Sequence, residues 1–450
     1  MKYKQGIIYL LLLFLIVGCG GGSSSDSSSS GEPSIPPTDP LPPPITDIDC
    51  KNTDSDHLGE NTSEYWCAYV NTRDEATGLF DPSYSEKSET ILADFSFAGY
   101  MRGELPLPDT SNLDNYDVYD VTDFGAIAND DVSDKSAIKA LVANIAEDRK
   151  GKTDYKPAMI YFPKGQFILN DSSDMVFIHP DLTEKELEQL QPIVIYLDNV
   201  VIRGEGSDTI LFMKEKFLPV NPKEMWSTPY MLRIGAPYSS VSARANVIGD
   251  ASAFSTKTIQ VSQTRGFGIG DAIELSSKVT DPKVIDMFIE PYVFEKKHGN
   301  TMWTSLKSGL IRKSKHMIVD IQSNRLILDS PIPHDVQSNH NWNVTKIGSY
   351  SNIGVENLVL RGNWQDKFVH HGSADHDGAY SLLSLGRANN SWVRNVEFHD
   401  VNRALDISNS FNITNVNVSI TGNGGHSAIS VVNSNNILSK EIRDTANTWH

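Results

Sequence analysis

The stretch from Asp375 to Ile407, DHDGAYSLLSLGRANNSWVRNVEFHDVNRALDI, gathers the residue types most suited to chemistry. It places His, Asp, Arg and Tyr between short apolar runs that are typical of strands. Histidine transfers protons near neutral pH, and arginine can hold a carboxylate through two parallel hydrogen bonds. If these side chains converge, they predict acid–base chemistry on a substrate that carries carboxylates. Whether they converge depends on how the strands stack.

A repeat in the last hundred residues predicts that stacking. The segments SLLSLGRANNS, ALDISNS and AISVVNS align by their apolar pattern, which brings Leu383, Leu405 and Ile429 into register at spacings of 22 and 24 residues. A second register would join Val393, Ile413 and Ile437, at spacings of 20 and 24. Coils of this length are typical of a three-sheet β-solenoid, in which stacked Ile, Leu and Val fill the core.

Asn-Ser dipeptides end these segments and predict a structural turn rather than a catalytic group. They are Asn390-Ser391, Asn409-Ser410 and Asn433-Ser434. Asparagine tolerates the left-handed backbone conformation, and its amide can bond to the next coil. We therefore expect a ladder of asparagines stacked at matching positions.

The first register also predicts columns of polar side chains. Three residues before each stacked apolar position come Tyr380, Asn402 and His426. Two residues before come Ser381, Arg403 and Ser427, and five residues before come Gly378, Asp400 and Gly424. Neighbouring coils lie about 4.8 Å apart. Tyr380, Arg403 and His426 are therefore expected along one edge of the solenoid, joined by Asp400, as a catalytic group.

This group suits the cleavage of a uronate chain by β-elimination. Arg403 could neutralise the uronate carboxylate, while His426 removes the C5 proton and Tyr380 protonates the leaving oxygen, or the reverse. The residues expected to bind substrate around them are His371, His376, Asp377, Arg387 and His399. The loop HHGSADHD also offers a metal site, with Asp375 and Asp377 as ligands for Ca²⁺, or a zinc site. No cofactor is certain from the sequence.

Other roles remain open for several of these residues. A hydrolase would need paired carboxylates, for which Asp377, Asp400 and Asp406 are candidates. Arg403 could instead form only a salt bridge with Asp400, and the loop histidines could be ordinary surface residues. A surface protein that binds carbohydrate without catalysis is a third possibility.

The start of the main domain predicts the element that covers the coil. The stretch YDVTDFGAIANDDVSDKSAIKALVANIAEDRK ends one strand and begins a helix near Ser133 or Asp134. The expected helix carries apolar residues at Ile138, Leu141, Val142 and Ile145, the spacing of an amphipathic helix. The strand AMIYF, a Pro-Lys-Gly turn and another strand follow.

This opening resembles that of pectate-lyase-like right-handed parallel β-helix proteins, a group that includes polygalacturonases, polysaccharide lyases and phage tailspikes. The resemblance implies an all-β fold, a right-handed parallel β-helix with an N-terminal capping helix, and an acidic polysaccharide as substrate. The short sequence motifs typical of polygalacturonases are not evident, which favours a lyase over a hydrolase. We add to this fold a β-rich insertion at about 246–347, where the sequence is typical of antiparallel hairpins.

The N-terminus reads as an export signal. Lys2 and Lys4 precede a short apolar run that ends at Cys19 in a pattern resembling a bacterial lipobox. By that resemblance residues 1–19 are a lipoprotein signal peptide, Cys19 is lipidated, and the Gly20 that follows favours the outer membrane of a Gram-negative cell. An extracellular or periplasmic protein with a plain signal peptide is the alternative.

The remaining sequence predicts the domain order. Residues 20–49 form a Gly/Ser/Pro-rich linker, residues 50–115 a segment that packs on the main domain, and residues 116–450 the β-helix, with C-terminal coils expected beyond the last residue. The cysteine pair Cys50 and Cys67 predicts a disulfide in an exported protein. The 450 residues carry a formal net charge of −18, which argues against a nucleic-acid partner.

Overall fold

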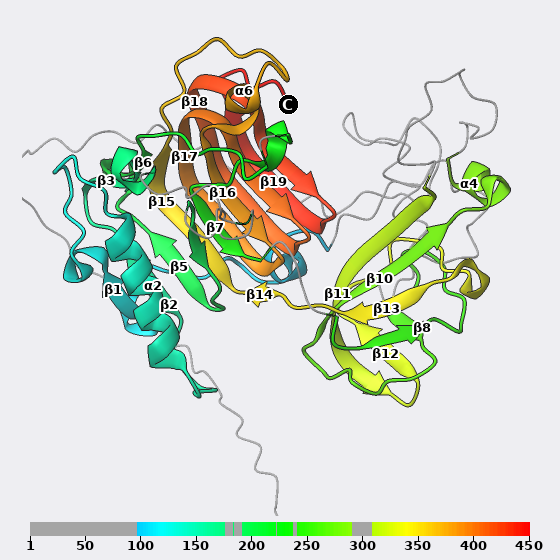
Figure 1. Ribbon diagram of the computed structural model, residues 1–450. Coiled ribbons are helices and arrows are strands. Elements are labelled where there is room, and N and C mark those ends of the chain that lie inside the picture. The colour runs from blue at the N-terminus through cyan, green and yellow to red at the C-terminus, as the bar shows by residue number, and fades with distance from the viewer. Residues whose placement is uncertain (1–96, 176–182, 184–190, 222, 237–240, 290–307) are drawn as a thin grey trace, which may run out of the picture.

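The computed structural model describes residues 97–175, 183, 191–221, 223–236, 241–289 and 308–450. The predicted signal peptide with Cys19, the linker and the Cys50–Cys67 disulfide lie outside these residues. The described chain is mainly strand and forms two sheets, one curled and parallel and one antiparallel (Figure 1). No helix in the described ranges has the length and apolar character needed to cross a membrane.

The curled sheet is built from parallel pairings. Its strands are β1 (Asp117–Asp120), β2 (Ala158–Tyr161), β3 (Gly165–Asn170), β4 (Ile193–Ile195), β5 (Val200–Arg203), β6 (Thr209–Met213), β7 (Leu232–Gly235), β14 (Tyr350–Ser351), β15 (Ile353–Arg361), β16 (Ser381–Gly386), β17 (Ala388–Ser408), β18 (Phe411–Val432) and β19 (Asn435–Asp444).

These strands stack along three faces. One face runs β1, β2, β5, β15, β17, β18, β19. The second runs β3, β6, β15, β17, β18, and the third runs β4, β7, β16, β17, β18. The long strands β17 and β18 take part in all three faces, so the sheet curls into stacked coils, as the period predicted.

The register that defines the candidate site is confirmed. Leu383 pairs with Leu405, which pairs with Ile429. The column of Ser381, Arg403 and Ser427 is confirmed by the same pairings.

Two other register predictions are wrong. Ile413 pairs with Ile437 as expected, but Val393 pairs with Asn415, two residues further along. Gly424 lies opposite Val401 rather than Asp400, because the pairing shifts between His399 and Arg403.

Asparagine ladders line the turns, and two of the three predicted members, Asn409 and Asn433, stack as expected. Asn412 donates to Asn390, and Asn436 donates to Asn412, while Asn409 and Asn433 stack at another turn. All five adopt left-handed backbone angles. The prediction of left-handed Asn turns is therefore confirmed, but Asn390 belongs with Asn412, because Ser391 pairs with Ile413.

The helix expected near Ser133 is α2 (Lys135–Arg149), which begins after Asp134. It buries Ile138, Leu141 and Ile145 in the core of the coil and lies beside β1 and β2 in Figure 1. Asp134 makes no side-chain capping bond, because its carboxylate accepts from the backbone of Ile127 and Ile168.

The other α-helices are α4 (Pro282–Ile289) and α6 (Ala374–Gly378). The short 3₁₀ helices are η2 (Tyr100–Gly103), η3 (Leu113–Asn115), η4 (Val121–Phe124), η5 (Ser172–Met175), η6 (Gly206–Asp208), η7 (Met225–Ser227) and η8 (Ser338–His340).

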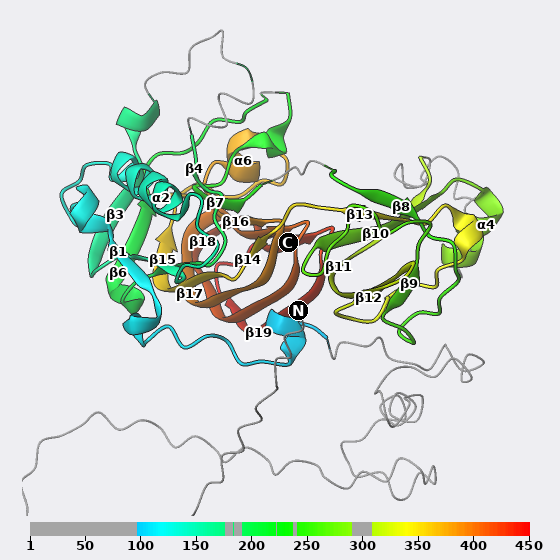
Figure 2. The ribbon, with the colours of Figure 1, turned by 90° about the horizontal axis from the view of Figure 1, so that it is seen from below.

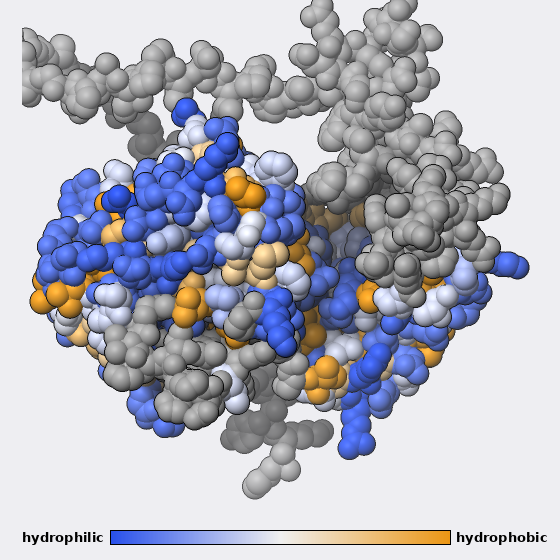
Figure 3. All heavy atoms as spheres, turned by 45° about the horizontal axis from the view of Figure 1, so that its top comes forward, coloured by the Kyte–Doolittle hydropathy of each residue, from blue (hydrophilic) through white to orange (hydrophobic). Residues whose placement is uncertain are grey.

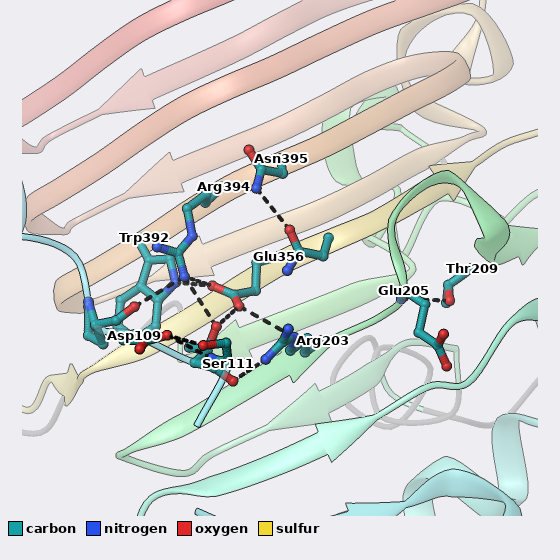
Figure 4. A network of polar contacts seen from close by, with 12 residues as sticks. Asp109, Ser111, Arg203, Glu205, Thr209, Glu356, Trp392, Arg394 and Asn395 are labelled. Atoms are coloured by element: carbon teal, nitrogen blue, oxygen red, sulfur yellow. Dashed lines mark hydrogen bonds and ion pairs between the residues drawn. The ribbon is translucent and has the colours of Figure 1, made fainter. Parts of the chain in front are cut away.

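A buried carboxylate fastens the chain before β1 to the coil (Figure 4). Glu356 is fully buried and accepts from Trp392 Nε1 at 2.9 Å and from Arg394 Nη2 at 2.6 Å. Thr110 also donates to it, and Arg203 lies 3.9 Å away. A buried charge is tolerated only when it is paired and hydrogen-bonded in this way, so this network fixes residues around Thr110 against two coils.

The antiparallel sheet lies to one side of the coil (Figure 2). Its strand order is β8 (Arg244–Asn246), β13 (Asn343–Lys346), β10 (Ala272–Val279), β11 (Leu310–Gln322), β12 (Arg325–Leu328) and β9 (Thr258–Gln260). It has an apolar core of its own that includes Ile273, Leu326 and Trp342. Of the antiparallel hairpins expected in this stretch, the one formed by β11 and β12 is present. The one expected from β9 and β10 is not, because β9 pairs with β12 and β10 with β11 and β13.

The antiparallel sheet contacts the turns of the coil through polar groups. The Lys315 backbone N–H donates to the Asn435 side chain, and the ammonium of Lys315 donates to the Asn433 carbonyl. Asn412 donates to the carboxylate of Asp329 at 3.1 Å. The asparagine ladder therefore also holds the second sheet.

Candidate functional site

A pocket of about 320 Å³ opens on the third face of the coil, beside α6. Its lining includes Tyr230, His371, Asp377, Arg403, Asp406 and His426, together with Trp226, Ser427, Ile429, Ser430 and His450. Four of the predicted site residues therefore meet here: Arg403, His426, His371 and Asp377. The face around α6 is mostly hydrophilic, with hydrophobic residues scattered over it (Figure 3).

Arg403 lies at the centre of this group because small residues leave room for it. Its column neighbours are Ser381 and Ser427. A Cβ on Gly378 would lie 2.0 Å from Nη2 of Arg403, so only glycine leaves space for the guanidinium there. The guanidinium carbon lies 5.4 Å from the centroid of the Tyr230 ring, within the range of a cation–π contact.

Tyr230 is the pocket residue that the sequence reasoning missed. The pairing of Leu232 with Leu383, and the bond from Met231 N–H to the Ser381 carbonyl, put Tyr230 in the column of Ser381 and Arg403. Its side chain is largely buried, and burial raises the pKa of its hydroxyl. Aligning MLRIG at β7 with LLSLG at β16 would have revealed it.

His426 and His371 approach the pocket from different elements. Burial lowers the pKa of His426, partly offset by Asp377. His371 Nδ1 lies 2.8 Å from Asp377 Oδ2, and the His371 backbone N–H donates to the other oxygen at 3.1 Å. Asp377 is buried, so this pair fixes the orientation of the His371 ring.

Asp406, which the sequence offered only as a carboxylate for the hydrolase alternative, also lines the pocket. Burial raises its pKa, against the opposing effects of Ser408, Ser384 and the positively charged Arg403. Ser384 Oγ donates to it at 3.2 Å. A carboxyl group with a raised pKa can hold a proton nearer to neutral pH, as a general acid must.

Tyr380 and Asp400, two of the four predicted catalytic residues, do not line the pocket. The Tyr380 ring packs partly against the core of the coil. Burial raises its pKa to about 12, with further contributions from Glu215, Asp375 and Asp366. Asp400 is buried and accepts from Asn423 and Gln365, so its carboxylate is held at a turn.

The other predicted substrate-binding residues also lie away from the pocket. His376 accepts from the backbone of Val369. His399 Nε2 lies 3.2 Å from Asp400, and its Nδ1 contacts Thr421. Arg387 is at a turn of the coil, where burial lowers its pKa.

Asp375 and Asp377, the predicted ligands for Ca²⁺, have different partners and do not form a shared metal site in the structure. Asp375 forms an ion pair with Lys216 at 2.5 Å, whereas Asp377 binds His371. Three histidines come closer to a metal-binding arrangement. One ligand atom from each of His370, His371 and His426 lies within 4.8 Å of the others.

Comparison with known proteins gives structural neighbours only. A scan against protein-family models found no match, and a search of the curated proteins found none either. The solved structures that resemble this chain include the tailspike protein gp49 from Pseudomonas phage LKA1, at 12% identity and a TM-score of 0.42, covering 72% of this chain and 50% of that one.

Two further structures are similar to a lesser degree. One is the tailspike of Acinetobacter baumannii bacteriophage AP22 in complex with A. baumannii capsular saccharide, at 10% identity and a TM-score of 0.36, covering 68% of this chain and 43% of that one. The other is the A-module of an Azotobacter vinelandii mannuronan C-5 epimerase, at 12% identity and a TM-score of 0.30, covering 71% and 49%. The chain spans about half the length of these three structures.

Proposed function

We propose that the pocket around Arg403 cleaves an acidic, uronate-containing polysaccharide by β-elimination. The observation that carries this proposal is the meeting of Arg403, Tyr230 and His426 in one pocket. These residues supply the three roles that the reaction needs: a cation for the carboxylate, a base and an acid.

The geometry favours a role for each residue. Arg403 would bind the uronate carboxylate and make the C5 proton easier to remove. His426 would take that proton, because burial lowers its pKa and keeps the imidazole neutral at neutral pH. Tyr230 would donate its proton to the leaving oxygen, because burial raises its pKa and keeps the hydroxyl protonated.

The electron balance of the reaction requires no other reagent. The electrons of the C5–H bond form a double bond between C5 and C4, the bond from C4 to the glycosidic oxygen breaks, and the departing oxygen receives the Tyr230 proton. The exposed indole of Trp226, at 63% relative exposure, lies at the rim of the same pocket. It offers a flat surface on which a sugar ring can stack.

The proposal extends to fold class and location. We infer that the stacked coils form a right-handed parallel β-helix whose end α2 covers. We further propose that the protein is exported and held at the outer membrane through a lipid on Cys19, where it would meet extracellular polysaccharide. Lipidation can be tested by labelling cells with an acyl analogue, comparing the natural chain with Cys19→Ser.

The activity can be tested by incubating the chain with a panel of acidic polysaccharides. A lyase produces unsaturated uronate ends, seen by their ultraviolet absorbance, in equal number to new reducing ends. Tyr230→Phe and His426→Ala should each lower the rate without changing the fold measured by circular dichroism. Cleavage that persists unchanged in both variants would place the chemistry elsewhere.

Hydrolysis is a second candidate, supported by the raised pKa of Asp406 in a pocket that also holds Asp377. A hydrolase uses one carboxyl group as the acid and another as base or nucleophile. The same assay separates the two, because hydrolysis yields reducing ends without unsaturated product. In a hydrolase, Asp406→Asn would abolish cleavage. In a lyase, the same substitution would change the rate only through its effect on Arg403.

A further inference from the structure

Three histidines gather at the edge of the pocket, from two parts of the chain. His370 and His371 precede α6, whereas His426 belongs to β18. Their ring centroids lie 3.8 Å (His370–His371), 5.4 Å (His370–His426) and 5.7 Å (His371–His426) apart. One ligand nitrogen from each lies within 4.8 Å of the others. Packing so many imidazoles together is unfavourable if they are protonated, but it suits a shared cation.

Two of these rings have features that suit a metal ligand. His371 Nδ1 faces the buried carboxylate of Asp377 at 2.8 Å, which leaves its Nε2 lone pair free to bind an ion. Metal-binding histidines commonly have such a carboxylate partner, because it fixes the tautomer and raises the basicity of the ligand nitrogen. His426 Nε2 is buried and has no hydrogen-bond partner among the described residues. A buried, unpartnered nitrogen loses hydration without compensation, which a bound ion would restore.

We propose that His370, His371 and His426 bind a transition-metal ion of the zinc class. Imidazole nitrogen suits zinc, copper and nickel, whereas calcium requires oxygen ligands. In a tetrahedral zinc site with Zn–N bonds of about 2.0–2.1 Å, the ligand nitrogens lie about 3.3 Å apart. The three nitrogens, each within 4.8 Å of the others, would have to move closer to reach that spacing. His450 Nε2 lies 3.3 Å from His370 Nε2 but is not part of the group whose ligand atoms all approach within 4.8 Å.

The metal would compete with the proposed chemistry, and this part of the inference depends on the lyase function. His426 can either accept the C5 proton or bind the ion, because a ligand lone pair is not available to a proton. A bound ion would also place positive charge beside Arg403. We therefore infer that the ion inhibits β-elimination, and that its removal by a chelator restores the rate.

The binding test uses the full chain, treated with a chelator and then titrated with Zn²⁺ or Co²⁺. Calorimetry should show one Zn²⁺ per chain, and Co²⁺ should give the intense visible absorption of a tetrahedral site. His370→Ala should weaken Zn²⁺ binding by at least the ten- to hundredfold that loss of an outer-shell partner costs. Asp377→Asn should weaken it less. The control His340→Ala, in η8 of the antiparallel region, should bind as the natural chain does.

The outcomes separate this inference from the proposed function. Absence of Zn²⁺ and Co²⁺ binding, or equal binding by His370→Ala, overturns the metal site whatever the activity. Metal binding without cleavage of any polysaccharide supports the site and counts against the lyase. If cleavage occurs, Zn²⁺ should slow the natural chain, and the zinc response of His370→Ala, normalised to its own zinc-free rate, should be lost.

Discussion

The two sheets bring their residues together in different ways. In the coil, Arg403 and His426 come from successive turns and Tyr230 from a turn much earlier in the sequence, and parallel stacking carries them to one pocket. In the antiparallel sheet, a buried polar group such as His316 is satisfied by Ser314 and Ser330, which are near it in the chain. The stacking of repeated turns in the coil therefore assembles the pocket, whereas the antiparallel sheet forms a separate body with its own core. The first three predictions below perturb one sheet and use the other as reference, and the fourth tests the contact between them.

The largest effect should follow from removing the central cation of the coil. Arg403→Ala should lower kcat/KM for uronate cleavage by about a thousandfold, the typical result of losing one preorganised charge-stabilising group. Arg403→Lys should recover only part of the rate, because an ammonium cannot bind a carboxylate through two parallel bonds. Arg325→Ala, an exposed arginine on the antiparallel sheet, should leave the rate unchanged. Equal rates in Arg403→Ala and Arg325→Ala would mean that the pocket is not the catalytic site.

Acid should destabilise the antiparallel sheet before the coil. Burial lowers the pKa of His316 to about 4, with Asp329 opposing this and His334 and Lys315 adding to it. The unfolded chain takes up the proton near pH 6.5. The stability contributed by neutral His316 is therefore present above that pH and lost as the pH falls towards 4, by roughly 3 kcal/mol.

Urea unfolding at several pH values, followed by peptide-resolved hydrogen exchange, measures this difference between the sheets. His316→Gln keeps a donor and an acceptor for Ser314 and Ser330 but cannot be protonated in this range. Its antiparallel sheet should lose less stability in acid than that of the natural chain. An identical pH dependence in both would show that His316 does not control it.

A single methyl group should disturb the pocket without disturbing the fold. Gly378→Ala would put a Cβ 2.0 Å from Nη2 of Arg403, so the guanidinium must move. Displacement of a positioned group by about 1 Å can cost on the order of a hundredfold in rate, so we expect a tenfold to hundredfold loss of kcat/KM. Gly268→Ala, in the antiparallel region, meets its nearest neighbour at an ordinary 3.7 Å. This variant should retain full activity and the same melting temperature.

The smallest effects should separate two asparagines that look alike in sequence. Asn412 and Asn417 both have left-handed backbones and both donate to an asparagine one coil earlier. Asn412 is buried and also binds Asp329, whereas Asn417 is exposed. Because glycine keeps the backbone conformation, Asn412→Gly should cost about 1–3 kcal/mol of unfolding free energy and Asn417→Gly less than about 0.5 kcal/mol. Equal losses in chemical denaturation would show that the link to the second sheet contributes nothing.

The sequence predicted the coil better than it predicted the site. Leu383, Leu405 and Ile429 repeat as apolar residues at a fixed place, and their register was correct. The predicted register of Val393 was wrong because its partner, Asn415, is a buried polar residue that bonds to Ser439. An alignment by apolar residues alone does not detect such a partner.

The errors at the site have equally local causes. A shift in pairing around Val401 moves Asp400 out of its expected column, and Asp400 itself has a left-handed backbone. Tyr230 was missed because the antiparallel sheet separates its coil from the others in sequence. Tyr380 was placed in the correct coil, but a register states which residues are neighbours and not where a ring points.

The pairing between β8 and β13 has a consequence for how the molecule folds. Arg244 lies opposite Thr345, so the antiparallel sheet returns the chain close to where it left the coil. Closing a flexible loop of roughly a hundred residues costs about 2 kcal/mol more in entropy than closing one of roughly a dozen. Once the antiparallel sheet has formed, β7 and β14 are joined by an effectively short connection. We therefore expect this sheet to form early and to speed the addition of the later coils to the earlier ones, so that a segment outside the pocket governs how soon the pocket exists.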